Sequence, residues 1–329
     1  MKKLYLKNGY FNFRVVIETK SPFVFVVGGR GTGKTYGALD YAIESKEKFL
    51  YMRRTQTQLD ILNNDEFSPF KNVTDSVSLK KINKQLGGVY NSEGLLIGYT
   101  AALSTLSNIR GFSGQDIKLI IYDEFIPEKH ERLIKGETEA LLNAYETINR
   151  NRELNGEDAV KLVCLANSNR LDNPVFTDLD LIPLIQKQIK RGSAYHDYDD
   201  IGVCIILLTN SGISDKKCNT ALYRLATDEF AEMALNNNFL QSEYHCKHQP
   251  IIEYKPLIKY DKFYLYRHKA HNRIYVSTYR TGTFQEMSGE EFRTIMFPVV
   301  KSRLINNELF FDNFNTKSKF ILKSGLTID

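Results

Sequence analysis

Short continuous apolar runs, rather than alternating ones, recur along the first two thirds of the chain. They lie within residues 23–27, 49–54, 119–124, 161–169, 181–185 and 201–208. Runs of this length, bounded by glycine, proline or polar residues, are typical of strands buried on both faces of a parallel sheet. Residues 34–48 and 139–154 instead predict helices, because their apolar residues recur every three or four positions. The alternation of strands and helices predicts an α/β domain over residues 1–212.

The rest of the pattern predicts three further features. Within the first domain, residues 76–103 indicate a β-hairpin or meander with a turn at Asn91-Ser92-Glu93-Gly94. Residues 213–243 indicate a helical linker or lid. From residue 244 onward, short aromatic strands precede a helix with Ser288 as its N-cap and a glutamate at its third helical position. We therefore expect a second, small α+β domain over residues 244–329.

Charge is distributed unevenly between these regions. The 329 residues carry a formal net charge of +5, yet residues 244–329 hold 14 lysines and arginines against 8 aspartates and glutamates. That surplus of six leaves the rest of the chain near −1. A basic module joined to a near-neutral one suggests contact with a polyanion, of which nucleic acid is the usual one. A basic surface that only aids solubility is the alternative.

Composition narrows the class of protein further. Hydrophobic residues make up 42% and charged residues 25%, as in globular proteins. We expect no membrane span, because no run of about 18 apolar residues exists, and no secretory signal, because the N-terminus lacks an apolar core. Four scattered cysteines indicate reduced thiols. His245, Cys246 and His248 are close in sequence, but no second ligand pair completes a zinc site, so we expect no bound metal there.

The strongest chemical signal is GGRGTGKT, which follows one predicted strand and precedes a helix. It fits the phosphate-binding loop, or P-loop, pattern G-x-x-x-x-G-K-[ST]. Its glycines let backbone N–H groups point at phosphate oxygens, while Lys34 would reach the β- and γ-phosphates and the Thr35 hydroxyl would coordinate Mg²⁺. The predicted nucleotide-binding residues here are Gly28, Gly29, Arg30, Gly31, Thr32, Gly33, Lys34 and Thr35.

A second signal is LIIYDE, a predicted strand that ends in two carboxylates. Beside a P-loop this pattern indicates a Walker B strand, in which Asp123 would hold Mg²⁺ and Glu124 would polarise the attacking water. The adjacent glutamate favours hydrolysis over phosphoryl transfer to an acceptor. The Asn83-Lys84 pair is not followed by the aspartate of a guanine-reading motif, which favours ATP over GTP.

Polar residues elsewhere are further candidates for this site. In P-loop ATPases of the additional-strand class, the strand after Walker B ends in a polar residue that senses the γ-phosphate. Asn167 is our candidate for this sensor. The alternative is that Asn167 only marks the transition from strand to loop. Arg150 and Arg152 end the predicted helix before that strand. They would cap this helix or project toward a neighbouring subunit's γ-phosphate as an arginine finger. Arg110, in the loop before Walker B, would reach phosphate or the next subunit, or simply face solvent.

The ordered set GGRGTGKT, FLYMRRT, IRG, LIIYDEF, LLNAYETINRNRE and CLANSN is more specific than any one piece. It resembles the genome-packaging ATPases of small tailed phages, the phi29-like family, which are relatives of the large terminase subunits. The likeness covers the predicted ATPase domain and continues more weakly from FAEMALNNNF to FFDNFN. It implies an additional-strand, terminase-like P-loop NTPase with a helical linker and a small RNase H-like C-terminal domain.

The resemblance also implies a role for each matching position. The Walker A motif is matched by Gly28, Gly33, Lys34 and Thr35, and the arginine within that loop by Arg30. Walker B and its catalytic glutamate are matched by Asp123 and Glu124. Arg150 matches the trans-acting arginine finger, and Arg110 matches a basic residue that acts on the neighbour's nucleotide.

One position departs from the family pattern. Arg53 and Arg54 end a predicted strand, on the ligand side of the sheet. Relatives can carry a lysine shortly after this arginine pair, whereas this chain has Gln56. A direct grip on DNA phosphate at that position is therefore in doubt.

The partners that the resemblance implies are those of a packaging motor. Family members form a homopentameric ring on the portal vertex of an empty capsid and pump double-stranded DNA inward. The expected cofactors are ATP and Mg²⁺, and the expected partners are double-stranded DNA, further copies of the chain, the portal and, as an open alternative, a structural RNA. The expected location is the host cytoplasm and, transiently, the portal vertex.

The C-terminal domain is expected to bind nucleic acid without cutting it. Nuclease chemistry of the terminase kind needs clustered carboxylates around two metals, and residues 244–329 contain only Asp261, Asp312 and Asp329 as aspartates. Three rival functions stay open at this stage. They are a terminase with an active nuclease, a nucleotide-gated DNA-binding module that does not turn ATP over, and a helicase or loader ATPase.

Overall fold

The structure is a computed structural model that describes residues 3–64, 66–106, 114–128, 131–167, 170–209, 211–225 and 245–326. The chain divides into two compact units. The first comprises residues 1–171 and 185–240, and the second comprises residues 172–184 and 241–329. Arg110 and the stretch from 226 to 243 of the predicted linker lie outside the described residues.

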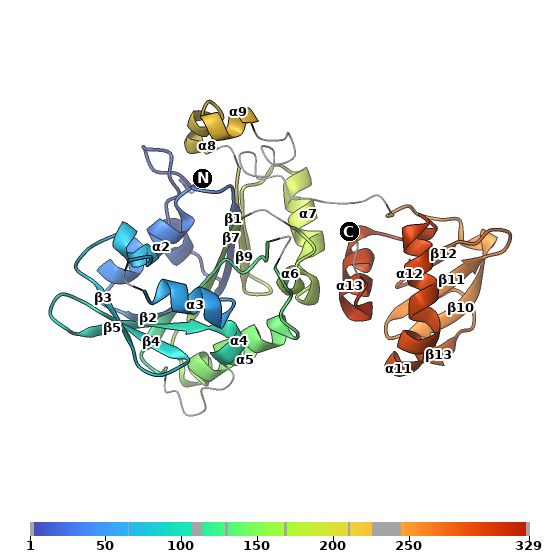
Figure 1. Cartoon of the computed structure of the whole chain (residues 1–329), viewed down its shortest axis with the longest axis horizontal. Coiled ribbons are helices and arrows are strands. Elements are labelled where there is room, and N and C mark those ends of the chain that lie inside the picture. Colours follow the sequence, from blue (N-terminus) through green and yellow to red (C-terminus); the bar gives the residue numbers. More distant parts are fainter. Residues whose placement is uncertain are drawn as a thin grey trace. The chain divides into compact units, whose positions relative to one another are not determined.

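The first unit is built on a sheet of nine described strands in the order β3-β4-β5-β2-β6-β7-β1-β9-β8 (Figure 1). The strands are β1 Phe23–Gly28, β2 Lys48–Arg53, β3 Ser78–Lys81, β4 Leu86–Tyr90, β5 Leu96–Ala102, β6 Ile117–Asp123, β7 Lys161–Asn167, β8 Tyr195–Tyr198 and β9 Val203–Leu208. Six neighbouring strands of this sheet run parallel to one another, namely β5, β2, β6, β7, β1 and β9. Strands β3, β4 and β8 pair antiparallel at the two edges.

Strand β7 lies between β1 and β6, pairing with both in parallel. The strand that follows Walker B is thus inserted between the P-loop strand and the Walker B strand. Together with the mostly parallel sheet, this arrangement confirms the predicted α/β fold class. The carboxyl ends of β1, β6 and β7 therefore meet at one edge of the sheet, where ligands of open α/β sheets bind.

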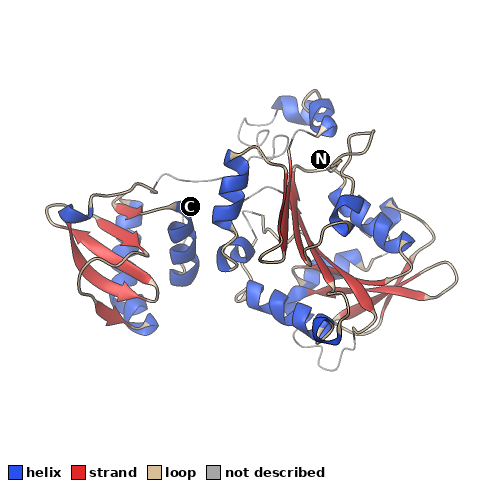
Figure 2. Cartoon of the chain, turned by 180° about the vertical axis from the view of Figure 1, so that it is seen from behind, coloured by secondary structure: helices blue, strands red, loops and turns tan. Residues whose placement is uncertain are grey.

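Helices and helical turns surround this sheet (Figure 2). They are α1 Arg14–Ile17, α2 Lys34–Glu44, α3 Gln56–Leu62, η1 Pro69–Asn72, α4 Leu103–Leu106, α5 Glu137–Asn149, η2 Glu153–Asn155, α7 Ile182–Lys190, α8 Gly212–Lys217 and α9 Ala221–Leu225.

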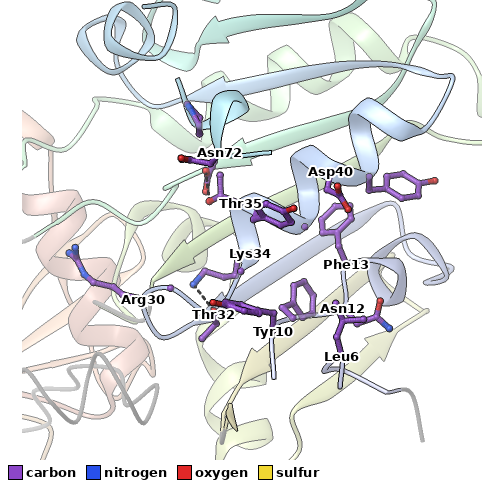
Figure 3. A pocket seen from close by; sticks show the side chains of 18 of the residues that line it. Leu6, Tyr10, Asn12, Phe13, Arg30, Thr32, Lys34, Thr35, Asp40 and Asn72 are labelled. Atoms are coloured by element: carbon purple, nitrogen blue, oxygen red, sulfur yellow. Dashed lines mark hydrogen bonds between the residues drawn. The ribbon is translucent and has the colours of Figure 1, made fainter. Parts of the chain in front are cut away.

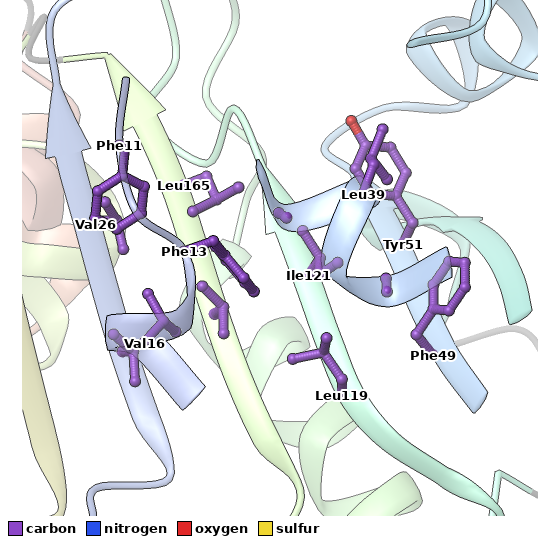
Figure 4. Close-up of a cluster of buried hydrophobic side chains, with 14 of the residues drawn as sticks. Phe11, Phe13, Val16, Val26, Leu39, Phe49, Tyr51, Leu119, Ile121 and Leu165 are labelled. Atoms are coloured by element: carbon purple, nitrogen blue, oxygen red, sulfur yellow. The ribbon is translucent and has the colours of Figure 1, made fainter. Parts of the chain in front are cut away.

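Both faces of the central strands are covered, which explains their continuous apolar sequence. In β1, Val24 and Val26 belong to the core shared with α1, α2 and α3 (Figure 4). The alternate residue Phe23 packs instead on Tyr145 of α5, with ring centroids 4.6 Å apart. Successive side chains of a strand point to opposite faces, so an apolar residue is needed at every position.

One predicted element in this region is wrong, and another has a different end. Residues 181–185 were expected to form a strand, but helix α7 begins within them, at Ile182. The apolar residues Ile182, Ile185 and Ile189 lie on a helical repeat that the short run concealed. The helix expected over residues 139–154 ends at Asn149, because Arg150 adopts a positive φ of 50° that a right-handed helix cannot continue.

The second unit is a small α+β domain with a five-stranded sheet in the order β13-β10-β11-β12-β14. Its strands are β10 Tyr254–Tyr260, β11 Phe263–His268, β12 Ile274–Ser277, β13 Gln285–Met287 and β14 Leu309–Phe311. Its helical segments are α6 Pro174–Asp178, η3 Ile251–Glu253, α11 Gly289–Glu291, a π-helical turn Phe292–Met296, α12 Phe297–Ile305 and α13 Phe314–Ser324.

Local sequence explains the main helical stretch of this unit. The Ser288 hydroxyl accepts a hydrogen bond from the Glu291 N–H, and the Glu291 carboxylate accepts one from the Ser288 N–H. This capping box confirms the predicted start of the helix. The ring of Phe292 then stacks on Tyr260 with centroids 3.9 Å apart, which docks the helix on the sheet.

The extent of this unit differs from that of the predicted C-terminal domain. Residues 172–184 were expected in the first domain, but they belong to the second unit. Helix α6 packs against α13, and Lys319 forms an ion pair with Asp180. Such contacts join residues far apart in sequence, so no local pattern could have assigned this segment.

Candidate functional site

The P-loop has the backbone that its glycines predict. Gly31 and Gly33 adopt φ values of +69° and +88°, a region that residues with a side chain rarely enter. A Cβ atom at Gly33 would also lie 3.0 Å from the ring of Tyr10. The loop leads directly into α2, whose first turn presents backbone N–H groups and the positive end of the helix dipole. These features make an anion-binding site.

Lys34 lies across the loop in an almost fully buried position, with 7% of its surface exposed (Figure 3). Its Nζ donates to the carbonyl oxygens of Gly28 and Gly29, both at 2.9 Å, and to Asn167 Oδ1 at 3.2 Å. Burial lowers the pKa of Lys34 to about 7; Asp123 opposes this shift. Lys34 is thus held by neutral oxygens that a phosphate oxygen can replace.

Thr35 and Asp123 provide a pair of oxygen ligands suited to Mg²⁺. The Thr35 hydroxyl donates to Asp123 Oδ2 at 2.8 Å, and the Tyr51 hydroxyl donates to the same oxygen at 2.7 Å. Hydroxyl and carboxylate oxygens are the hard ligands that this cation prefers. Tyr51 is fully buried, and burial followed by the Asp123 charge holds its pKa well above the usual value. It therefore remains a neutral donor that orients the carboxylate.

Glu124 follows directly and has an unusual backbone. Its φ of 58° lies in the left-handed region, which costs energy for a residue with a side chain. Its N–H donates to Asp123 Oδ1 at 3.0 Å. The side chain is half exposed and forms an ion pair with Arg53, which also lies 3.4 Å from Asp123. Burial alone would lower the pKa of Arg53, but Tyr51 and these carboxylates outweigh it and raise the pKa.

The structure separates the two arginines that end the predicted second strand. Arg53 faces the site, as predicted, whereas Arg54 has no exposed surface and points away from it. Its guanidinium donates to both carboxylate oxygens of Glu137, at 2.8 and 3.0 Å, and to Glu131 at 3.1 Å. Tyr122 donates to the same Glu137 at 2.7 Å. The two-residue period of a strand indicates that adjacent arginines cannot share a face.

Arg30 and Asn167 have different partners at the P-loop. Arg30 points away from Lys34 in Figure 3 and forms an ion pair with Glu128. Asn167 ends β7 opposite Gly28 of β1, so its amide reaches the P-loop lysine. This is where a γ-phosphate sensor would have to lie, and its role stays a prediction.

The two arginines at the end of α5 differ in their surroundings. Arg152 is buried and donates to the carbonyl of Gln115, so it has a structural position. Arg150 is exposed at the C-cap of α5, and its Nε donates to the carbonyl of Thr147 at 3.2 Å. An exposed guanidinium is what a finger acting on another subunit requires, and this role stays a prediction.

A cavity of about 880 Å³ opens above these residues. Its walls come from the P-loop, the start of α2, residues 6–14 and Asn72. Tyr10 and Tyr36 add partly exposed aromatic rings beside the loop. The volume and the mixture of apolar walls with a few polar groups suit a nucleotide.

The predicted absence of a zinc site concerns a different region. The His245 ring hydrogen-bonds the carbonyl oxygen of Leu309 at 2.9 Å, and burial lowers its pKa. Among the described residues, no group of three or more histidine, cysteine, aspartate or glutamate side chains is arranged to hold a metal ion. Within the same residues, no helix has the length and apolarity needed to cross a membrane.

Comparisons with known proteins agree with this geometry. The family model of the Podovirus DNA encapsidation protein (Gp16) matches residues 5–287. The DNA packaging proteins of Bacillus phages PZA and phi29 are each 29% identical over 240 residues, covering 71% of this chain and 67% of the relative. The DNA packaging protein of Bacillus phage B103 is 30% identical over 222 residues, covering 66% of this chain and 64% of the relative.

Two solved structures share the fold across nearly the whole chain. The Phi-28 gp11 DNA packaging motor gives a TM-score of 0.65 at 20% identity, covering 98% of this chain and 100% of that one. The bacteriophage Phi-29 viral genome packaging motor assembly gives 0.63 at 22% identity, covering 96% and 99%. The resemblance inferred from the ordered motifs is thus confirmed by a family model that spans most of the chain. The chain belongs to the Podovirus DNA encapsidation protein (Gp16) family.

Proposed function

We propose that this chain is the ATPase of a motor that uses ATP hydrolysis to move double-stranded DNA into a procapsid. The observation that carries the proposal is the convergence of Lys34, Thr35, Asp123 and Glu124 at one edge of the parallel sheet. Lys34 and Thr35 begin α2 directly after the P-loop, whereas Asp123 and Glu124 lie at the end of β6. Together they would supply phosphate binding, metal ligation and a general base.

The residues present fit ATP with Mg²⁺. Lys34 would exchange the carbonyls of Gly28 and Gly29 for the β- and γ-phosphates, keeping its hydrogen bonds while gaining an anionic partner. Thr35 and Asp123 would hold Mg²⁺, which supplies charge neutralisation at the phosphates.

Glu124 would take the proton of the attacking water. In the structure its carboxylate is engaged in an ion pair with Arg53. Activation therefore requires the Glu124 side chain to leave Arg53 and face the water. The exposure of Glu124 leaves it room to do so.

The exposed position of Arg150 supports assembly into a ring. A finger at the end of α5 would complete the charge stabilisation of a neighbour's transition state. We propose a homo-oligomeric ring, with five subunits as the family resemblance suggests. It would act on the portal of the procapsid, either with or without a structural RNA, and would be found in the host cytoplasm and transiently at the portal vertex.

The basic second unit is the proposed contact for nucleic acid. Lysine and arginine contacts to phosphates release counterions, so binding should weaken steeply as salt concentration rises. A terminase with an active nuclease stays the alternative, which would need clustered carboxylates around two metal ions. Cleavage of plasmid DNA with Mn²⁺ would favour that alternative, and strand separation would favour a helicase.

The test is ATP turnover by the purified chain against protein concentration, with and without linear double-stranded DNA. Glu124→Gln and Arg150→Ala variants are assayed alone and mixed. A shared active site predicts two inactive variants and an active mixture, because one chain supplies Glu124 and its neighbour supplies Arg150. The matched control is the chain that carries both Glu124→Gln and Arg150→Ala. Mixed with either single variant, it should give no activity, because no site in such a mixture has both Glu124 and Arg150.

Two results would count against the proposal. If the mixture of single variants stays inactive while the chains still associate, Arg150 does not act across subunits. If the wild-type chain binds ATP but shows no turnover in the assembled state, the nucleotide-gated module becomes the better account.

A further inference from the structure

A second lysine approaches the P-loop from a distant part of the sequence. Lys217 is the last residue of α8, and its Nζ donates to the carbonyl oxygen of Arg30 at 2.5 Å. The same ammonium group fills the space that a side chain at Gly31 would need. The open backbone of Gly31 is therefore what allows Lys217 to reach the loop.

The start of α8 is anchored close to the loop. The Ser211 hydroxyl donates to the carbonyl of Gly9 at 3.1 Å, and Ile213 is buried. The segment that contains Gly9 is itself tied to the P-loop, because the Phe11 N–H donates to the Thr32 carbonyl at 2.9 Å. These contacts set the distance from α8 to the loop, so the position of Lys217 follows from packing.

The surroundings of Lys217 are unusual for a lysine. Burial lowers its pKa, and its charge in turn helps to lower the pKa of Lys34. Among the described residues, no carboxylate lies within ion-pairing distance of its Nζ. Arg30, whose carbonyl it contacts, directs its own guanidinium to Glu128 instead. Two ammonium groups thus face one loop, and their hydrogen-bond acceptors among the described residues are neutral oxygens.

Position along the loop indicates which phosphate this charge would meet. The first turn of α2, with Lys34 and Thr35, receives the α- and β-phosphates on its N–H groups. Lys217 lies over Arg30 and Gly31, in the other half of the loop. It is also close enough to Lys34, which reaches the β- and γ-phosphates, for their charges to repel. A terminal phosphate would lie between the two lysines.

We propose that Lys217 is a second phosphate-binding lysine, which leaves the Arg30 carbonyl and donates to the γ-phosphate when ATP occupies the loop. The inference rests on the proposed nucleotide function of the site and adds a residue that distinguishes ATP from ADP. With ADP, Lys217 keeps its bond to the carbonyl, because no third phosphate is present. The competing role is a purely structural one, in which Lys217 only fastens the loop.

The test is equilibrium binding of ADP and of a non-hydrolysable ATP analogue to the full chain, with Mg²⁺ present. Lys217→Met should weaken binding of the analogue about tenfold or more, the usual worth of a charge-assisted hydrogen bond. Its affinity for ADP should change less than about twofold, which also shows that the variant is folded. Lys217→Arg should restore much of the lost affinity. Lys216→Met, at the exposed neighbouring position, is the matched control and should behave as wild type.

The outcomes separate the alternatives. Equal weakening of both nucleotides by Lys217→Met would show a structural role and overturn the inference. Unchanged binding of both would also overturn it. If the wild-type chain binds neither nucleotide, the proposed function itself fails, and the inference fails with it.

Discussion

Arg54 offers a direct test of how the first unit is held together. Its guanidinium and the carboxylate of Glu137 are both fully buried and form two hydrogen bonds, while Tyr122 donates a third to the carboxylate. These contacts join the end of β2 to the start of α5. Replacing Arg54 with methionine keeps most of the side-chain volume but leaves Glu137 with the Tyr122 hydroxyl as its remaining donor among these groups.

The cost of that change follows from burial. Removing one partner of a buried ion pair typically destabilises a protein by about 3–5 kcal/mol, because the other charge remains desolvated. At about 1.4 kcal/mol for each factor of ten, the first unit should open about 100 to several thousand times more often. Replacing both partners, as in Arg54→Met with Glu137→Leu, should recover most of the loss, because no fully buried charge is then left unpaired. Glu131 also loses its ion pair with Arg54, but its side chain is partly exposed to solvent.

Amide hydrogen exchange resolves this effect within the chain, since it reports the opening free energy of each segment. Peptides from β1 and β2 should lose protection in Arg54→Met and regain it to within about tenfold in the double variant. Peptides from β11 and β12, in the second unit, are the internal reference and should not change. Unchanged exchange in β1 and β2, or a double variant as unprotected as the single one, would refute the reasoning.

Three further predictions concern single sites. Because the pKa of Lys34 is about 7 in the empty site and ATP requires its ammonium form, ATP binding should take up a proton above that pH and weaken about tenfold for each further pH unit. Calorimetry in buffers of different ionisation enthalpy measures this proton uptake, which Lys34→Met should abolish. The free energy of unfolding of the empty protein should instead rise with pH between about 7 and the ordinary lysine pKa of about 10.4, because the unfolded chain holds the Lys34 proton in that range and the folded chain does not. Tyr51→Phe should raise the Mg²⁺ concentration that ATP turnover requires, because Asp123 loses the donor that orients it; an unchanged magnesium titration would contradict this. Ser288→Ala should cost about 1 kcal/mol and increase amide exchange in the second unit alone, and equal loss of protection in the first unit would be inconsistent with a local cap.

Much of the fold and of the site could be predicted because it depends on short, local sequence patterns. The P-loop is contiguous, and its glycine positions, lysine and threonine are all needed within eight residues. The parallel strands were visible because a strand buried on both faces is apolar at every position. The capping box at Ser288 needs only residues three apart, and it forms as predicted.

Other features depend on contacts between distant segments. Nothing local indicates that Arg54 is buried against Glu137, or that Arg53 pairs with Glu124 on the opposite side of the strand. The short apolar run at residues 181–185 fits a strand and a helix equally well, and α7 resolves it only through packing.

The sequence alone therefore determined which residues are predicted to bind phosphate and metal, since local backbone geometry and residue type suffice for that prediction. Only the tertiary structure decided which charged side chains meet. Lys217 is separated from Arg30 by 187 positions, yet its ammonium group lies on the loop. Ion pairs and hydrogen bonds act over a few ångströms, so their partners are chosen by the packing of the sheet and its helices, whatever their separation along the chain.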